Sequence, residues 1–365
     1  MSSETMRTNE VQIVDFAPFI DDTSTTEQKQ MVANDILRSF QSIGFVYLIN
    51  HGLDAEKASS MFDWSRKLFD LPPEVKALAP HPVSGAHHRG YSAPGREKVK
   101  QYSESGSESD GVNATELASG QNVLDVVRDI KESFESGRED DDEMPNIWFP
   151  DGIFPGFKEA CLDFYWACFE TEKLILKALA LGHNLPQDYF LPYHSQADNQ
   201  LRLLHYPSIP ASLLKNEKAS RIPSHTDFCS LTMLMQDNIG GLEVEDPNHA
   251  GVFIPVPPVP GSIVVNAGDF LMRWSNNTIK STVHRVRIPP SLVDGSSSNA
   301  DTIPSRYSIP YFCGADSSTI IDCIPGTWST ERPKLYSPIS VLTNSRVPFA
   351  IQAREYVMER LAANY

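Results

Sequence analysis

Apolar residues that recur every three or four positions predict helices in four parts of the chain. These parts are residues 32–43, 54–70, 157–182 and 348–361. Gly44 and the pair Pro72-Pro73 end the first two helices, because glycine and proline interrupt helical hydrogen bonding. The third stretch is the longest and has a broad apolar stripe, so we expect it to support a sheet.

The pattern changes between Leu201 and Cys313 to short apolar runs separated by proline, glycine and asparagine. Such runs are typical of an all-β barrel or jelly roll. Two further short strands are predicted at residues 11–16 and 45–49. Residues 103–120 contain too few apolar side chains to offset the entropy of ordering, so we expect a mobile loop there.

The composition narrows the class of protein. The chain has 365 residues, of which 41% are hydrophobic, and a formal net charge of −16. This charge argues against binding to nucleic acid or anionic membranes, which both need a basic surface. The five cysteines form no CxxC pair, which suggests reduced thiols in the cytosol. Without an apolar run long enough to span a membrane or direct export, we expect a cytoplasmic protein.

A candidate metal site is formed by His225, Asp227 and His284. His225 and Asp227 are two positions apart beside the β-prone run 231–235, and on a strand such residues point to the same face. His284 lies in another run of strand composition, 281–288. Together they would make a 2-His-1-carboxylate set, which leaves about three of six octahedral positions open on Fe(II). A buried structural histidine is the alternative for an isolated His-x-Asp, and zinc is the main competing metal, although no HExxH pair is present.

Arg306 and Ser308 form a candidate anion site. They are again two positions apart in a strand-like run, and a guanidinium beside a hydroxyl suits a carboxylate. Phe312 lies six residues after Arg306, and therefore on the same face if Pro310 introduces no bulge.

In this order, His-x-Asp, a distant His and Arg-x-Ser resemble the Fe(II)/2-oxoglutarate-dependent dioxygenases, in the branch that includes isopenicillin N synthase. Six further segments are similar to that branch, and their order is more specific than any one of them: residues 13–16, 43–52, 68–72, 89–91, 129–134 and 260–269. The resemblance implies a mainly β fold with flanking helices around a double-stranded β-helix, a jelly-roll and cupin-like core. It places an N-terminal mixed region at 1–195, the core at 196–315 and a C-terminal segment with a helix at 316–365, all in one structural unit.

The same resemblance implies an activity and its cofactors. The chain would couple oxidative decarboxylation of 2-oxoglutarate to oxidation of a C–H bond in a small organic molecule, such as one of secondary metabolism, with Fe(II) and O₂. Hydroxylation, desaturation and ring closure use the same residues, so the sequence does not separate them or identify the substrate.

Individual residue roles also follow from the resemblance. The distal carboxylate of 2-oxoglutarate would bind Arg306 and Ser308, with Tyr206 hydrogen-bonded nearby. The candidates for the substrate side are Phe312, Leu242, Val286, Ile222 and Arg89, the last of which could meet a substrate carboxylate. For the four apolar candidates, plain core packing is the alternative.

Two other functions stay open at this point. One is an oxidase like isopenicillin N synthase, which uses the same iron ligands without 2-oxoglutarate. The other is a catalytically silent protein that binds a small molecule on the same scaffold. The chain departs from the plant members at Leu204, where they usually have asparagine, and in a longer connection at 289–304.

Overall fold

The computed structural model describes residues 10–82, 87–95, 128–129, 131–210, 219–287, 289, 302–320 and 322–336. The loop expected at 103–120 and the helix expected at 348–361 lie outside the described residues. The proposed division at 195 and 315 is not tested by the structure and stays a prediction.

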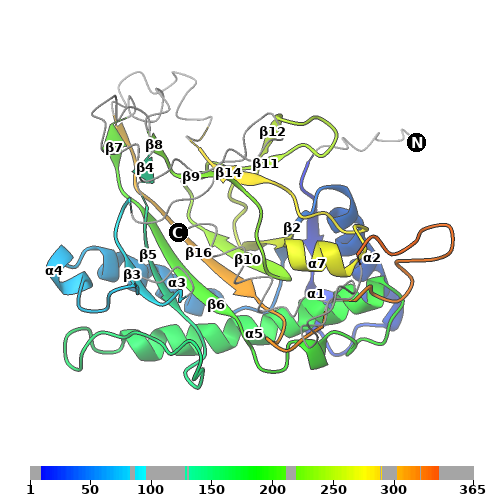
Figure 1. The fold of residues 1–365 in the computed structure, drawn as a ribbon, viewed down its shortest axis with the longest axis horizontal. Coiled ribbons are helices and arrows are strands. Elements are labelled where there is room, and N and C mark those ends of the chain that lie inside the picture. Colours follow the sequence, from blue (N-terminus) through cyan, green and yellow to red (C-terminus); the bar gives the residue numbers. More distant parts are fainter. Residues whose placement is uncertain are drawn as a thin grey trace, which may run out of the picture.

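Two facing sheets form the centre of the described molecule (Figure 1). The large sheet has the strand order β1 (Ile13–Asp15), β2 (Phe45–Ile49), β13 (Ser262–Ala267), β10 (Leu231–Gln236), β16 (Arg306–Cys313), β6 (Gln200–Tyr206), β5 (Glu132–Ser136) and β3 (Gly90–Ser92). The small sheet has the order β12 (Phe253–Pro255), β11 (Leu242–Glu245), β14 (His284–Val286) and β9 (Ile222–His225). Two strand pairs complete the described β structure: β15 (Thr302–Ile303) with β7 (Ile209–Pro210), and β4 (Arg128–Asp129) with β8 (Ala219–Ser220). The predicted double-stranded β-helix with flanking helices is confirmed.

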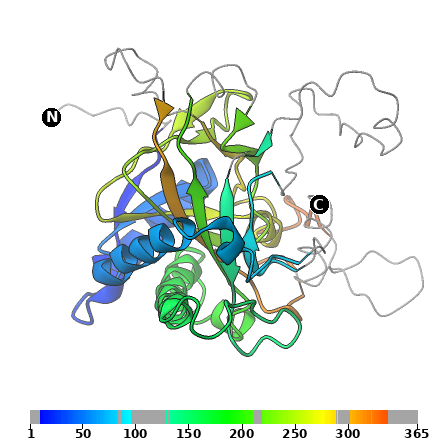
Figure 2. The same cartoon turned by 90° about the vertical axis from the view of Figure 1, so that its left-hand side faces the viewer.

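Helices cover the outer face of the large sheet. The helices in contact with this sheet are α2 (Thr26–Ser42), α3 (Ala55–Phe69) and α5 (Phe157–Gly182). The other described helices are α1 (Ala17–Ile20), α4 (Pro73–Lys76), α7 (Asp269–Trp274) and the short 3₁₀ turn Leu191–Tyr193. The long helix α5 runs below this sheet in Figure 1 and is seen nearly end-on below it in Figure 2. Its Tyr165 ring meets Tyr311 of β16 edge-on, with the ring centroids 5.2 Å apart. The prediction that α5 supports the barrel is therefore confirmed.

Local chemistry explains where these helices begin and end. The Thr25 hydroxyl and the Gln28 side chain form a reciprocal capping box at the start of α2, and Asp54 caps α3. After α2 the chain turns into β2 at Gly44, which has φ +76°. A Cβ atom there would lie 2.4 Å from the carbonyl oxygen of Lys280, so this turn requires glycine.

Alternation along the strands divides the core into two parts. On β16 the odd positions, such as Ile309 and Tyr311, face the helices, and the even positions, such as Arg306 and Ser308, face the small sheet. A second apolar cluster fills the space between the sheets and joins residues of both: Phe45, Tyr47, Val264, Leu242, Val244 and Val286. The polar side chains of the candidate site lie on this inner face, at the end of the apolar cluster.

The five cysteines are free thiols, as predicted, and Cys161 and Cys168 are both fully buried on α5. Within the described residues, no helix has the length and apolar character needed to cross a membrane.

Candidate metal centre

Three side chains converge at the end of β9. His225 is the last residue of this strand, and His284 lies opposite it as the first residue of the neighbouring strand β14. Asp227 follows β9 rather than lying on it, so the strand geometry expected for His-x-Asp is wrong in detail. The ligand atoms still meet, because Asp227 Oδ1 lies 3.8 Å from His225 Nε2 and 3.7 Å from His284 Nε2.

Backbone carbonyls fix the orientation of both histidines. His225 Nδ1 donates to the carbonyl of Pro223 at 2.9 Å, and His284 Nδ1 donates to that of Thr282 at 3.1 Å. Since a carbonyl can only accept, each ring carries a proton on Nδ1 and directs Nε2 toward Asp227. This is the arrangement of metal-binding histidines, whose second nitrogen is held by an outer partner.

The carboxylate of Asp227 is held in the same way. Its Oδ2 accepts hydrogen bonds from the hydroxyl of Thr232 at 2.6 Å and the amide of Asn266 at 2.8 Å, which leaves Oδ1 for the centre of the site. Burial raises the pKa of Asp227, but His284, His225 and these two hydrogen bonds outweigh it, so the pKa is lowered overall. Asp227 is therefore anionic at neutral pH.

His225 is neutral at the same pH. Burial, followed by the neighbouring His284, lowers the pKa of His225 to about 4. A deprotonated imidazole and an ionised carboxylate are the forms that bind a metal ion. The donor set of two nitrogens and one oxygen therefore fits Fe(II) with open coordination positions.

The backbone near Asp227 is closely packed. The N–H of Asp269, at the start of α7, donates to the carbonyl oxygen of Asp227 at 2.7 Å. The residue before it is Gly268, where a Cβ atom would lie 2.1 Å from the carbonyl oxygen of Cys229 and 3.0 Å from that of Asp227. Glycine is required at this turn because the two backbones approach so closely.

Arg306, Ser308 and Tyr206 lie together on the inner face of the large sheet. Arg306 is opposite Tyr206 in the register of β16 and β6, and its guanidinium carbon is 5.0 Å from the Tyr206 ring centroid. Arg306 Nη1 donates to the Ser308 hydroxyl at 3.0 Å. All three are almost fully buried, yet Arg306 Nε and the Tyr206 hydroxyl have no hydrogen-bond partner among the described residues.

A second arginine at this position, Arg221, was missed by the sequence reasoning. It is fully buried, and its guanidinium carbon is 5.7 Å from the same Tyr206 ring. Nη2 donates to the carbonyl of Pro304, whereas Nε and Nη1 have no partner among the described residues. Burial, and then the charge of Arg306, lowers the pKa of Arg221 to about 10. The sequence feature that could have identified Arg221 is its position four residues before His225. Residues four positions apart on a strand point to the same face.

Phe312 lies on the same face as Arg306, as expected. The register of β16 runs without interruption past Pro310, so no bulge separates the two residues. Phe312 is opposite Thr232 on β10, the residue that holds Asp227, and the guanidinium of Arg202 lies 5.9 Å from its ring. Its side chain is partly exposed, at the strand position beside Thr232.

The other apolar candidates form a row across the small sheet. Val286 is opposite both Leu242 and Ile222, and all three belong to the cluster between the sheets. The structure thus brings them together, in positions that also serve core packing.

The structure places Arg89 away from the other candidates. Its guanidinium donates to the carbonyl of His88 at 2.8 Å and pairs with Asp141 at 3.3 Å. Tyr165 of α5 is also close enough to act on its charge, which places Arg89 toward the helix side of the sheet.

Two family models match the chain. Residues 11–151 match the N-terminal region of non-haem dioxygenases in morphine synthesis, and residues 197–315 match the 2OG-Fe(II) oxygenase superfamily. Among curated proteins, the chain is 36% identical to the 2-oxoglutarate-dependent dioxygenase frbA of Dothideomycetidae sp. over 300 residues, which is 82% of this chain and 84% of that protein. It is also 36% identical to the proline hydroxylase buaE of Petromyces alliaceus, over 83% of this chain and 86% of that one.

A solved structure covers almost the whole chain. It is a full-length Neurospora crassa protein crystallised in complex with alpha-KG and thymine. This protein superposes with a TM-score of 0.82 and 37% identity, over 99% of this chain and 98% of that one.

Proposed function

We propose, for a chain that belongs to the 2OG-Fe(II) oxygenase superfamily, that His225, Asp227 and His284 hold the iron and that Arg306 binds the distal carboxylate of 2-oxoglutarate. The chain is a 2-oxoglutarate-dependent dioxygenase, with Fe(II) as its metal and 2-oxoglutarate and O₂ as co-substrates. The iron supplies the redox chemistry that couples decarboxylation of 2-oxoglutarate to oxidation of a substrate C–H bond.

The pair of buried guanidinium groups is the observation that carries the co-substrate assignment. An arginine charge without an anion is costly inside a protein, and here Arg221 and Arg306 flank one tyrosine ring. Neither arginine forms an ion pair within the described parts of the chain. A dicarboxylate that reached this position would neutralise the cations and satisfy their remaining N–H groups. Ser308 and the Tyr206 hydroxyl would supply further hydrogen bonds.

The residues around the triad have complementary tasks. Thr232 and Asn266 keep one oxygen of Asp227 occupied, so that the other is directed at the metal. The carbonyls of Pro223 and Thr282 keep the imidazoles in the tautomer that presents Nε2. This fixed arrangement lowers the cost of assembling the site when iron binds.

The substrate is a small organic molecule that approaches along Phe312. Phe312 is partly exposed on the inner face and adjacent to the strand that holds Asp227, whereas Leu242, Val286 and Ile222 form the apolar floor. The relatives include a protein named a proline hydroxylase and the Neurospora crassa protein that binds thymine. We therefore assign this chain a substrate of similar size, in secondary metabolism.

The compartment and partners follow from composition. Five free thiols favour the reducing cytoplasm, and the net charge of −16 disfavours nucleic acid as a partner.

The test is the release of succinate and CO₂ by the iron-loaded protein across 2-oxoglutarate concentrations. Replacing Arg306 with alanine removes the buried fork and should weaken co-substrate binding by about 2 to 5 kcal/mol. Arg285→Ala is the matched control, because this guanidinium is paired with Glu243 at the small sheet and should leave half-saturation unchanged.

Two outcomes would contradict parts of this assignment. Substrate oxidation that needs no 2-oxoglutarate would identify an oxidase like isopenicillin N synthase. An unchanged half-saturation in Arg306→Ala would remove Arg306 from its role and leave the reaction class intact.

A further inference from the structure

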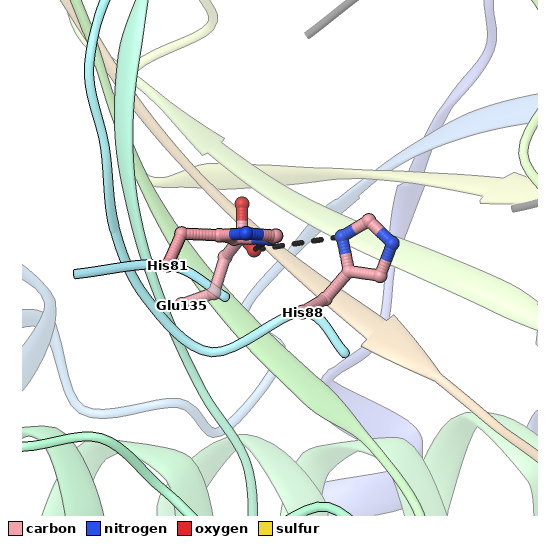
Figure 3. Close-up of side chains that lie close together, drawn as sticks. All are labelled: His81, His88 and Glu135. Carbon is pink, nitrogen blue, oxygen red and sulfur yellow. Dashed lines mark ion pairs between the residues drawn. The ribbon is translucent and has the colours of Figure 1, made fainter. Parts of the chain in front are cut away.

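A second group of potential metal ligands lies at the edge of the large sheet, apart from the triad. Glu135 is on β5, and β3 pairs with this strand so that Gly90 is opposite Glu135. His88 lies just before β3, and His81 lies at the end of the segment that follows α4. All three residues are at most 2% exposed. Figure 3 shows the three side chains together, with the His81 ring seen edge-on across the Glu135 carboxylate and a dashed line to His88.

The spacing of the ligand atoms is that of a metal site. Glu135 Oε2 lies 3.6 Å from His81 Nε2 and 3.6 Å from His88 Nδ1 (Figure 3). All three ligand atoms lie within 4.8 Å of one another. The corresponding separations in the triad of His225, Asp227 and His284 are 3.8 and 3.7 Å. The second group is therefore as compact as the first.

The tautomer of His81 favours a cation between the rings and the carboxylate. His81 Nδ1 donates to the carbonyl of Pro82 at 2.7 Å, so the neutral ring presents the lone pair of Nε2 to the anionic oxygen of Glu135. Nε2 is therefore the nitrogen of His81 that can bind a metal ion. His225 and His284 are held by carbonyls through Nδ1 in the same way.

The second oxygen of Glu135 is held by protein groups. Oε1 lies 2.7 Å from Arg202 Nη2 and accepts a hydrogen bond from the Ser133 hydroxyl at 3.0 Å. Such outer contacts orient a metal-binding carboxylate and leave its other oxygen for the metal. The positive charge of Arg202 disfavours hard cations such as Ca²⁺, which bind several carboxylate oxygens. The two imidazoles favour zinc, because zinc binds nitrogen ligands strongly.

We infer that His81, His88 and Glu135 form a second metal site that takes Zn²⁺, with three protein ligands and a water molecule in the fourth position. The site connects the segment before β3 to β5 and thereby stiffens the edge of the sheet. It also fixes Arg202, which is held by Glu135 and lies over the ring of Phe312. The zinc ion therefore acts as a structural ion that positions one wall of the substrate side.

The experiment isolates this site by disabling the triad. Protein carrying Asp227→Ala and His284→Ala is stripped with chelator, incubated with zinc chloride, dialysed and analysed for metal by mass spectrometry. About one zinc ion per chain is expected to remain, and additional His81→Ala should remove it. His87→Ala is the matched control, because the adjacent His87 is directed to the carbonyl of Pro145 and should leave zinc binding intact.

A milder variant tests the orientation of Glu135. Ser133→Ala removes one hydrogen bond to Oε1 and should weaken zinc binding by about 10- to 100-fold without abolishing it. Equal zinc binding with and without His81 would overturn the proposal.

A second measurement uses the unsubstituted full chain and so does not depend on how the variants fold. Crystals grown with zinc chloride should show an anomalous peak between His81, His88 and Glu135 at the zinc absorption edge. A peak only at His225, Asp227 and His284 would refute the second site and leave a protonated histidine paired with Glu135. The assignment of the triad is unaffected by either result.

Discussion

Replacing Arg221 with methionine should have opposite effects on the stability of the protein and on its affinity for 2-oxoglutarate. Arg221 is fully buried beside the second guanidinium, Arg306, and only its Nη2 atom has a hydrogen-bond partner among the described residues, the carbonyl of Pro304. Methionine has a similar length and no charge, so it removes the repulsion and keeps most of the packing.

The stability gain can be worked out from the pKa of Arg221. Burial and the charge of Arg306 lower this pKa from 12.5 to about 10. A lowered pKa of a base means that folding disfavours its charged form, at about 1.36 kcal/mol per pH unit, or roughly 3 kcal/mol at neutral pH. The lost hydrogen bond to Pro304 takes back about 1 to 2 kcal/mol. We therefore expect Arg221→Met to raise the free energy of unfolding of the ligand-free protein by about 1 to 2 kcal/mol.

The affinity for 2-oxoglutarate should change in the other direction. If Arg221 meets the distal carboxylate together with Arg306, its loss should cost about 2 to 5 kcal/mol, which corresponds to roughly 30- to 5,000-fold weaker binding. Stability is measured by urea unfolding without iron or co-substrate, and affinity by the half-saturation of succinate release. Arg285→Met is the control, since Arg285 already pairs with Glu243.

One combination of results would refute this reasoning. A less stable ligand-free Arg221→Met protein with unchanged half-saturation would show that Arg221 serves only to hold the Pro304 backbone.

Three further predictions concern the triad, the core and the substrate side. His284→Ala should abolish nearly all turnover and iron binding while the circular dichroism spectrum is retained; near-normal activity would show that the triad is wrongly assigned. Burial raises the pKa of Glu172 to about 8. Below about pH 4.5 its protonated form therefore contributes on the order of 5 kcal/mol to the free energy of unfolding. This contribution is lost as the pH rises from 4.5 through 8. Glu172→Gln should flatten this loss in urea unfolding between pH 5 and 9, whereas Glu170→Gln, an exposed change on the same helix, should retain it. Phe312→Ala should raise the KM for the organic substrate and alter the products, as read by mass spectrometry, and an unchanged KM and product pattern would place Phe312 outside the substrate site.

Local periodicity was sufficient to predict much of the fold. The strand Phe45–Ile49 and the helix Phe157–Gly182 match the expected ranges, because each has a clear apolar pattern and a glycine at one boundary. The convergence of His225, Asp227 and His284 was also predicted. The order of the His-x-Asp, His and Arg-x-Ser motifs indicates this long-range contact, whereas the helix or strand propensity of each residue does not. The position of Asp227 beyond its strand was not predicted, since the point at which a ladder ends depends on the partner strand.

Other parts of the site required the tertiary structure. Arg221 belongs to no motif, and its significance arises only from its burial beside Arg306. His81 and His88 belong to no sequence motif and lie in loops. Their burial depends on the pairing of β3 with β5, a contact between segments more than 40 residues apart that no local pattern reveals.

The register of the large sheet links the proposed substrate side to Asp227. Phe312 and Thr232 are directly opposite on β16 and β10, and the Thr232 hydroxyl donates to Asp227. A change in side-chain size at Phe312 alters the wall that a substrate meets, but the ladder of main-chain hydrogen bonds keeps Thr232 in place. A shift of β16 by one residue would instead turn Arg306 and Phe312 to the helix side and remove both from the site. On the proposed assignment, substrate range can therefore vary through side chains on this strand, while iron binding depends on the backbone register that they share.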